Sequence, residues 1–284
     1  MSQSDMPTMR SKRLGSELRR LRVARGLRVS QVAELLECGQ PKISQIENGK
    51  RGIRQIDLTL LLDKYGATDE KYRQSLKQLA RDVHKVDWWS SQGPLIHDTL
   101  RDYLTLESDS ELVRSYEPTI IPGLLQTEAY MRQLFTLVRP AERVEALVDA
   151  RMKRKELLEQ HPGFKLCAIV DQLALHRIPG HPEQVVEQLR YLDEAGQRPN
   201  VMLQVVPLKA QLPVDQYVPF CLFTLRGDAS IDVAWLEHAT GGTLLEQRHD
   251  VQNYAQVWAA LTAAALSPSD SRSCINDLVK EVRP

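Results

Sequence analysis

The chain has 284 residues, of which 42% are hydrophobic and 26% charged, a balance typical of a protein with a hydrophobic core. Its formal net charge of zero hides a division: residues 1–81 hold 17 Lys or Arg against 9 Asp or Glu, and the remainder holds 20 against 28. This length accommodates two domains. A basic first domain suggests a polyanionic partner, because phosphates bound by clustered Lys and Arg release counterions.

Several classes of protein are disfavoured by composition. No run of about 18 apolar residues occurs, and residues 1–13 lack the apolar stretch of a secretory signal, so we expect a cytoplasmic protein with no membrane association. The four cysteines stand alone, with no C-x-x-C pair and no His at metal-ligand spacing. We therefore expect no metal site and no cofactor.

The basic segment predicts a bundle of five helices. Leucines recur at helical spacing in the first helix, which ends at Gly26, and five arginines cover its other faces. Ser30 is the expected N-cap of the second helix. The predicted helices span residues 13–27, 28–37, 40–48, 54–66 and 69–86.

The third helix, within "GQPKISQIENGK" from Gly39 to Lys50, displays amide, hydroxyl and amine groups and offers only Ile43 and Ile46 to a core. A link of about three residues joins it to the second helix. Two short helices with a tight link in a basic bundle indicate a helix-turn-helix. Gln, Asn, Ser and Lys are suited to hydrogen-bonding base edges, and basic residues just beyond them to holding phosphates. A merely solvated surface is the alternative.

The stretch "VAELLECGQPKISQIENGKRGI", followed by "DLTLLLDKYG", resembles the lambda-repressor-like regulators, also called the xenobiotic-response-element type. The resemblance implies that the third helix reads double-stranded DNA, with Asn48 nearer the backbone than its other polar residues. Two departures stand out: Glu37 occupies a place that usually holds glycine, and Val29 removes an expected phosphate contact for which Arg28 substitutes. The DNA-binding residues we expect are Arg28, Ser30, Gln40, Pro41, Lys42, Ser44, Gln45, Asn48, Lys50, Arg51 and Arg54.

The rest of the chain begins with two helical stretches, after which the sequence pattern changes from that of helices to that of strands. β-Branched and aromatic runs flanked by Gly and Pro predict strands, and helices lie between and after them. The expected fold class is an all-α helix-turn-helix head followed by an α+β body with a small sheet backed by helices. The expected divisions are a disordered tail over 1–9, the head over 10–81, a junction over 82–110 docked by Trp88 and Trp89, and the body over 111–284. The predicted strands span 164–175, 200–208, 217–227 and 231–242, and the predicted helices 141–160, 181–196, 245–266 and 267–282.

Over nearly its whole length the chain is similar to a family of actinobacterial, antitoxin-type transcriptional regulators that join such a head to a C-terminal domain of unknown function. The matching stretches are "YEPTIIPGLLQTEAY", "RPNVMLQVVPL", "AALSPSDSR" and the tryptophan pair after Asp87. The resemblance implies a small protein partner encoded nearby and gives no catalytic residues.

The stretch "IIPGLLQTEAY" leaves two interpretations open. One is a buried strand-to-helix turn, with Thr127 capping the helix. The other is a ligand or partner site formed by Pro122, Gly123, Gln126 and Thr127, since a helix N-terminus attracts negative charge.

Catalysis is not expected. Asp171, His176, Glu237 and His238 lie near predicted strand ends, but no nucleophile elbow, phosphate-binding glycine loop or metal signature accompanies them.

We therefore expect a sequence-specific DNA-binding transcriptional regulator that is a homodimer, with a body that senses a ligand or a small protein partner. The alternative is an antitoxin-like interaction protein that sequesters a small partner and autoregulates.

Overall fold

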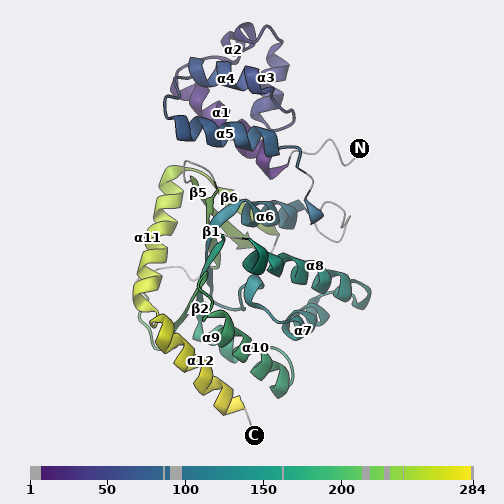
Figure 1. Ribbon diagram of the computed structural model, residues 1–284, viewed down its shortest axis with the longest axis vertical. Helices are drawn as coiled ribbons and strands as arrows, with labels where there is room; N and C mark the ends of the chain where they lie inside the picture. The colour runs from purple at the N-terminus through teal and green to yellow at the C-terminus, as the bar shows by residue number, and fades with distance from the viewer. Residues whose placement is uncertain are drawn as a thin grey trace. The chain divides into compact units, whose positions relative to one another are not determined.

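The computed structural model describes residues 8–85, 87–89, 98–161, 163–212, 218–226, 231–238 and 240–282. The chain divides into two compact units, residues 1–91 with 226–231 and residues 92–225 with 232–284. The first holds the helices of the head and the second holds the mixed α and β elements of the body, so the expected fold class is confirmed (Figure 1).

Within the described residues of the head, five α-helices enclose one hydrophobic core. Leucines from the first and fourth helices and isoleucines from the third supply much of it, including Leu18, Leu58 and Ile43. The helices are α1 (Met9–Ala24), α2 (Val29–Leu35), α3 (Gln40–Glu47), α4 (Gln55–Lys64) and α5 (Glu70–Asp82).

The boundaries at the start of the head differ from those predicted. Thr8 caps α1 by accepting a hydrogen bond from Ser11 N at 3.2 Å, so the helix begins at Met9, inside the stretch expected to be a tail; residues 1–7 of that stretch lie outside the described residues. Ser30 is not the N-cap of α2. The helix begins one residue before it, and the N–H of Arg28 donates to Gln31 Oε1 at 2.9 Å.

Several arginines of the head are buried, including two of the five that were expected to cover the non-leucine faces of the first helix. Arg10, Arg13 and Arg22 are all buried, and Arg10 Nη1 lies 2.7 Å from Asp87 Oδ2. Arg25 Nε donates to the carbonyl oxygen of Tyr65 at 2.6 Å. Part of the positive charge of the head therefore holds the bundle together.

The body contains more regular structure than predicted. A helix, α6 (Asp98–Ser108), lies within the expected junction, whose residues 86 and 90–97 are outside the described part of the chain. The strands are β1 (Ser110–Glu117), β2 (Lys165–Asp171), β3 (Val201–Val206), β4 (Phe220–Leu225), β5 (Ile231–His238) and β6 (Gly241–Leu245), and the other helices are α7 (Glu128–Val138), α8 (Ala141–Gln160), α9 (Gln172–His176), α10 (Pro182–Ala195), α11 (Arg248–Ala264) and α12 (Pro268–Val282).

The strands form one mixed sheet in the order β3-β2-β1-β4-β5-β6. β1, β2 and β3 run parallel, whereas β4 pairs antiparallel with β1 and β6 antiparallel with β5. The sequence indicated four strands; β1 was missed, and the last predicted strand, 231–242, covers β5 but only the first two residues of β6.

Helices cover both faces of the sheet (Figure 1). On the α11 side, Tyr116, Phe220 and Leu222 pack with Trp258 in one apolar cluster. On the other side, the ring of Tyr103 from α6 meets Phe223 and Trp235 edge-on at centroid distances of 5.4 and 6.0 Å.

Candidate nucleic-acid interface

Helix α3 separates an apolar side from a polar stripe. Ile43 and Ile46 are 2% and 3% exposed and pack in the head core. Three polar residues at spacings of four, Gln40, Ser44 and Asn48, are exposed together and form a line along the helix. Pro41 and Gln45 form an exposed row beside that line. The stripe therefore offers amide and hydroxyl groups to solvent from a helix fixed by two isoleucines.

A close approach between helices places α3 against α1. Gly15 lies so near the end of α3 that an added Cβ would be 2.5 Å from the carbonyl oxygen of Ile46 and 2.6 Å from that of Glu47. The carboxylate of Glu47 accepts two hydrogen bonds from Arg22, at 2.6 Å from Nε and 2.9 Å from Nη2. A bidentate pair fixes the relative orientation of its two groups as well as their distance. The pair therefore fixes the orientation of α3 relative to α1.

The link between α2 and α3 runs from Leu36 to Gly39 and contains a non-glycine residue with a positive φ. Glu37 has a φ of 48°, the left-handed conformation that glycine adopts without strain. The backbone is therefore left-handed at the position where the resemblance leads us to expect glycine. The helix ends as predicted at the Asn48-Gly49 turn, with a φ of 70° at Gly49.

The basic residues predicted to hold phosphates precede α2 or follow α3 in the chain. Arg28, Lys50, Arg51 and Arg54 are exposed. Lys42 is half-buried at the edge of α3, and its Nζ lies 3.7 Å from Asp57 Oδ2 on α4. The same carboxylate accepts hydrogen bonds from Arg54, from Nε at 3.0 Å and Nη2 at 2.9 Å. The hydrogen bonds from Arg54 hold the pKa of Asp57 below its ordinary value, so this carboxylate is ionised at neutral pH.

Nine of the predicted DNA-binding residues are exposed, and a binding role for them stays a prediction. Of the other two, Ser30 is half-buried, and Lys42 lies beside α4 rather than in the stripe. Sequence reasoning missed Gly15, Glu47 and Asp57. Only Asp57 carried a signal, because it follows Arg54 by three residues, a spacing that allows an ion pair.

In the body, "IIPGLLQTEAY" forms a buried turn around a short 3-10 helix, Gly123–Leu125. Pro122, Gln126 and Thr127 are buried, and Gly123 is half-buried. Thr127 caps α7 as predicted, accepting from Tyr130 N at 3.2 Å. Its own N–H donates to Gln188 Oε1 at 2.7 Å, and Gln188 Nε2 donates to the carbonyl oxygen of Leu125 at 2.7 Å.

Basic side chains of α8 close the other side of this turn. Arg151 Nη1 donates to Gln126 Oε1 and Lys155 Nζ to the carbonyl oxygen of Gln126, both at 2.6 Å. Burial lowers the pKa of Lys155 to about 8 and that of Arg151 to about 10. Arg154 forms a two-pronged ion pair with Glu107, and its Nη1 would lie 2.7 Å from a Cβ added at Gly123. This geometry favours the buried-turn interpretation; a binding role for the four turn residues stays a prediction.

Comparison with known families agrees with this division. A model described as a helix-turn-helix domain matches residues 13–84, and a model described as a domain of unknown function, DUF5753, matches residues 100–277. The second match covers more than half of the chain. The chain belongs to the DUF5753 family. No curated protein and no solved structure matches it.

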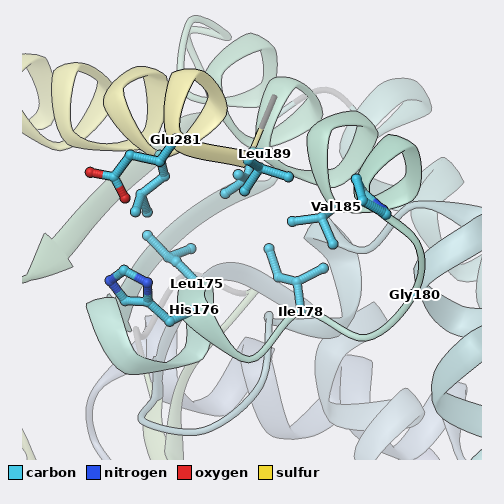
Figure 2. Close-up of a pocket in the computed structure, with 10 residues that line it drawn as sticks. Leu175, His176, Ile178, Gly180, Val185, Leu189 and Glu281 are labelled. Carbon is cyan, nitrogen blue, oxygen red and sulfur yellow. The ribbon is translucent and has the colours of Figure 1, made fainter. Parts of the chain in front are cut away.

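The DUF5753 domain contains a pocket of about 240 Å³ between α9, α10 and α12, lined mainly by aliphatic residues together with His176 and Glu281. Figure 2 shows Leu175, Ile178, Val185 and Leu189 pointing toward its interior, while the polar groups of His176 and Glu281 lie at its edge. His176 is the one residue of the predicted strand-end group that reaches this pocket's lining.

Two other residues of that group, Asp171 and His238, have separate hydrogen-bond partners. Asp171 caps α9 by accepting from Leu173 N at 2.8 Å, and His238 lies 3.0 Å from Thr240 Oγ1. Within the described ranges, no group of three or more His, Cys, Asp or Glu is placed to hold a metal ion. In the same ranges, no helix is long and apolar enough to cross a membrane.

Proposed function

We propose that this DUF5753 protein is a sequence-specific DNA-binding transcriptional regulator of the lambda-repressor-like type. The observation that carries the proposal is the exposed polar stripe of α3, held at a fixed angle by Gly15 and by the Arg22–Glu47 pair. A helix of this kind enters the major groove, where base edges present distinct patterns of donors and acceptors.

The proposal gives the exposed residues different tasks. Gln40, Ser44 and Gln45 hydrogen-bond base edges, since amide side chains pair well with adenine. Arg28, Lys50, Arg51 and Arg54 contact phosphates, which position the helix without reading sequence.

A homodimer is part of the proposal. One helix reads only a few base pairs, so useful specificity requires two copies that bind half-sites about one turn, or roughly 10 base pairs, apart. Because a transcriptional regulator must reach its DNA, we also propose that the protein is cytoplasmic.

We further propose that the DUF5753 domain is not an enzyme and binds a small ligand or a protein partner. The pocket bounded by Leu175, Val185 and Leu189 supports an apolar group as the occupant. An occupant changes DNA affinity only if it favours one relative placement of the two heads of the dimer: a placement that fits DNA raises the affinity, and one that does not lowers it.

The proposed function is tested by selecting duplexes from a random pool with the full-length protein. The expected result is one enriched motif with two half-sites about one turn apart. Gln45→Ala should relax the motif at one position in each half-site, whereas Gln74→Ala, at an exposed glutamine of α5, should leave it unchanged. A pool that stays random after selection with the wild-type protein would contradict sequence-specific binding.

A further inference from the structure

Asp57 is a buried carboxylate in the first turn of α4 that contacts two cations of the proposed DNA interface. The side chain of Asp57 is 9% exposed, that of Lys42 26% and that of Arg54 73%. One anion thus connects the edge of α3 with the residue that precedes α4.

The geometry leaves each cation able to bind a phosphate. Arg54 uses Nε and Nη2 toward Asp57, so Nη1 remains for a second acceptor. Lys42 lies 3.7 Å from Asp57, and an ammonium has three donors. Without Asp57, an arginine this exposed would sample many rotamers, and fixing it on DNA would cost entropy.

The charge of Asp57 also acts against misplaced DNA. A phosphate in contact with Arg54 and Lys42 is favoured, whereas a phosphate placed nearer the carboxylate meets a like charge. Discrimination between partners often depends on such a repulsive element.

We propose that Asp57 is a specificity-determining residue of the DNA interface, which positions Arg54 and Lys42 for one phosphate register and repels phosphates in other registers. The inference rests on the proposed function, since it concerns how the same interface separates its operator from other DNA. Asp57 is a positioning residue and contacts no base.

The test measures equilibrium affinities of wild type and Asp57→Asn for the selected operator and for a scrambled duplex, at two salt concentrations. The substitution keeps the size of the side chain but removes its charge. We expect tighter binding to scrambled DNA and a fall of about tenfold or more in the ratio of operator to scrambled affinity. Asp63→Asn is the matched control, because Asp63 is also on α4 and pairs with Arg73 at 2.7 Å but does not contact Lys42 or Arg54. It should leave the ratio unchanged.

If Asp57→Asn has the same ratio of operator to scrambled affinity as wild type, the inference is wrong. An equal change of that ratio in Asp57→Asn and Asp63→Asn also overturns it, because it would indicate an effect of net charge alone. If Asp57→Asn loses its fold by circular dichroism, Arg54→Gln decides: its side chain is largely exposed, and it should weaken operator binding more than scrambled binding. An unchanged ratio in Arg54→Gln then overturns the inference. A wild-type protein that binds both duplexes equally would instead contradict the proposed function.

Discussion

Glu37 shows how a single residue can conflict with the backbone that it must adopt. Its φ of 48° lies in the left-handed region, where a side chain crowds the following carbonyl group at a cost of about 1–2 kcal/mol. The resemblance to lambda-repressor-like proteins indicated glycine at this place, and the backbone supplies the physical reason.

Glu37→Gly should therefore stabilise the protein. Relief of the crowding outweighs the greater entropy of glycine in the unfolded chain, so we expect a net gain of about 1 kcal/mol in the free energy of unfolding. Urea denaturation checks the value. The matched control is Glu34→Gly in α2, where glycine should cost about 1 kcal/mol. If both variants are destabilised alike, the strain at Glu37 is not real.

The residues of the candidate interface were predictable only in part. The exposed places of Gln40, Ser44 and Gln45 follow from the helical period once Ile43 and Ile46 are assigned to the core. The burial of Arg22 does not follow, because its partner Glu47 is 25 residues away and lies on another helix.

Among the secondary-structure elements, the sequence patterns predicted the amphipathic helices well but missed the central strand β1. The helix predicted over residues 141–160 is α8, Ala141–Gln160, without a shift at either end. β1 was missed because a central strand with a parallel neighbour is usually a run of apolar residues, whereas "SELVRSYE" is half polar. Arg114 is tolerated there because its Nη2 donates to Asp232 at 3.0 Å and to Thr224 at 3.3 Å.

The last residue of β1 gives a pH-dependent prediction. Burial, reinforced by the nearby charge of Glu237, raises the pKa of Glu117 to about 8, while Arg154 and Arg151 oppose that shift. In the unfolded chain the pKa is about 4.3, so the folded state binds this proton more tightly. Stability from this group is full below about pH 4, is lost as pH rises, and is gone above about pH 8.

Glu117→Gln should remove that loss, because its amide does not ionise. The melting temperature of the variant relative to wild type should increase between pH 5 and 8 and then level off. Thermal melts across this range test it, with Glu111→Gln, at an exposed position of the same strand, as the control. A difference that does not vary with pH would show that Glu117 does not titrate in this way.

At the scale of the whole molecule, charge is segregated, with 17 basic against 9 acidic residues in positions 1–81 and 20 against 28 in the rest. DNA affinity should therefore depend strongly on salt through the head.

Lys50→Gln should reduce the slope of log affinity against log salt by about 0.9 on operator and scrambled DNA alike. Fluorescence anisotropy titrations measure the slope. Lys209→Gln, an exposed lysine of the body, is the control and should leave it unchanged. An unaltered slope in Lys50→Gln would remove Lys50 from the phosphate contacts.

Base readout by α3 is tested by measuring the affinity of the purified protein for its selected operator and for a scrambled duplex, with Gln45→Ala in parallel. Wild type should prefer the operator by about 10³-fold or more, and Gln45→Ala should lose mainly this preference. Equal binding of both duplexes, sensitive to salt alone, would contradict base readout by α3 and leave its polar stripe as a merely solvated surface.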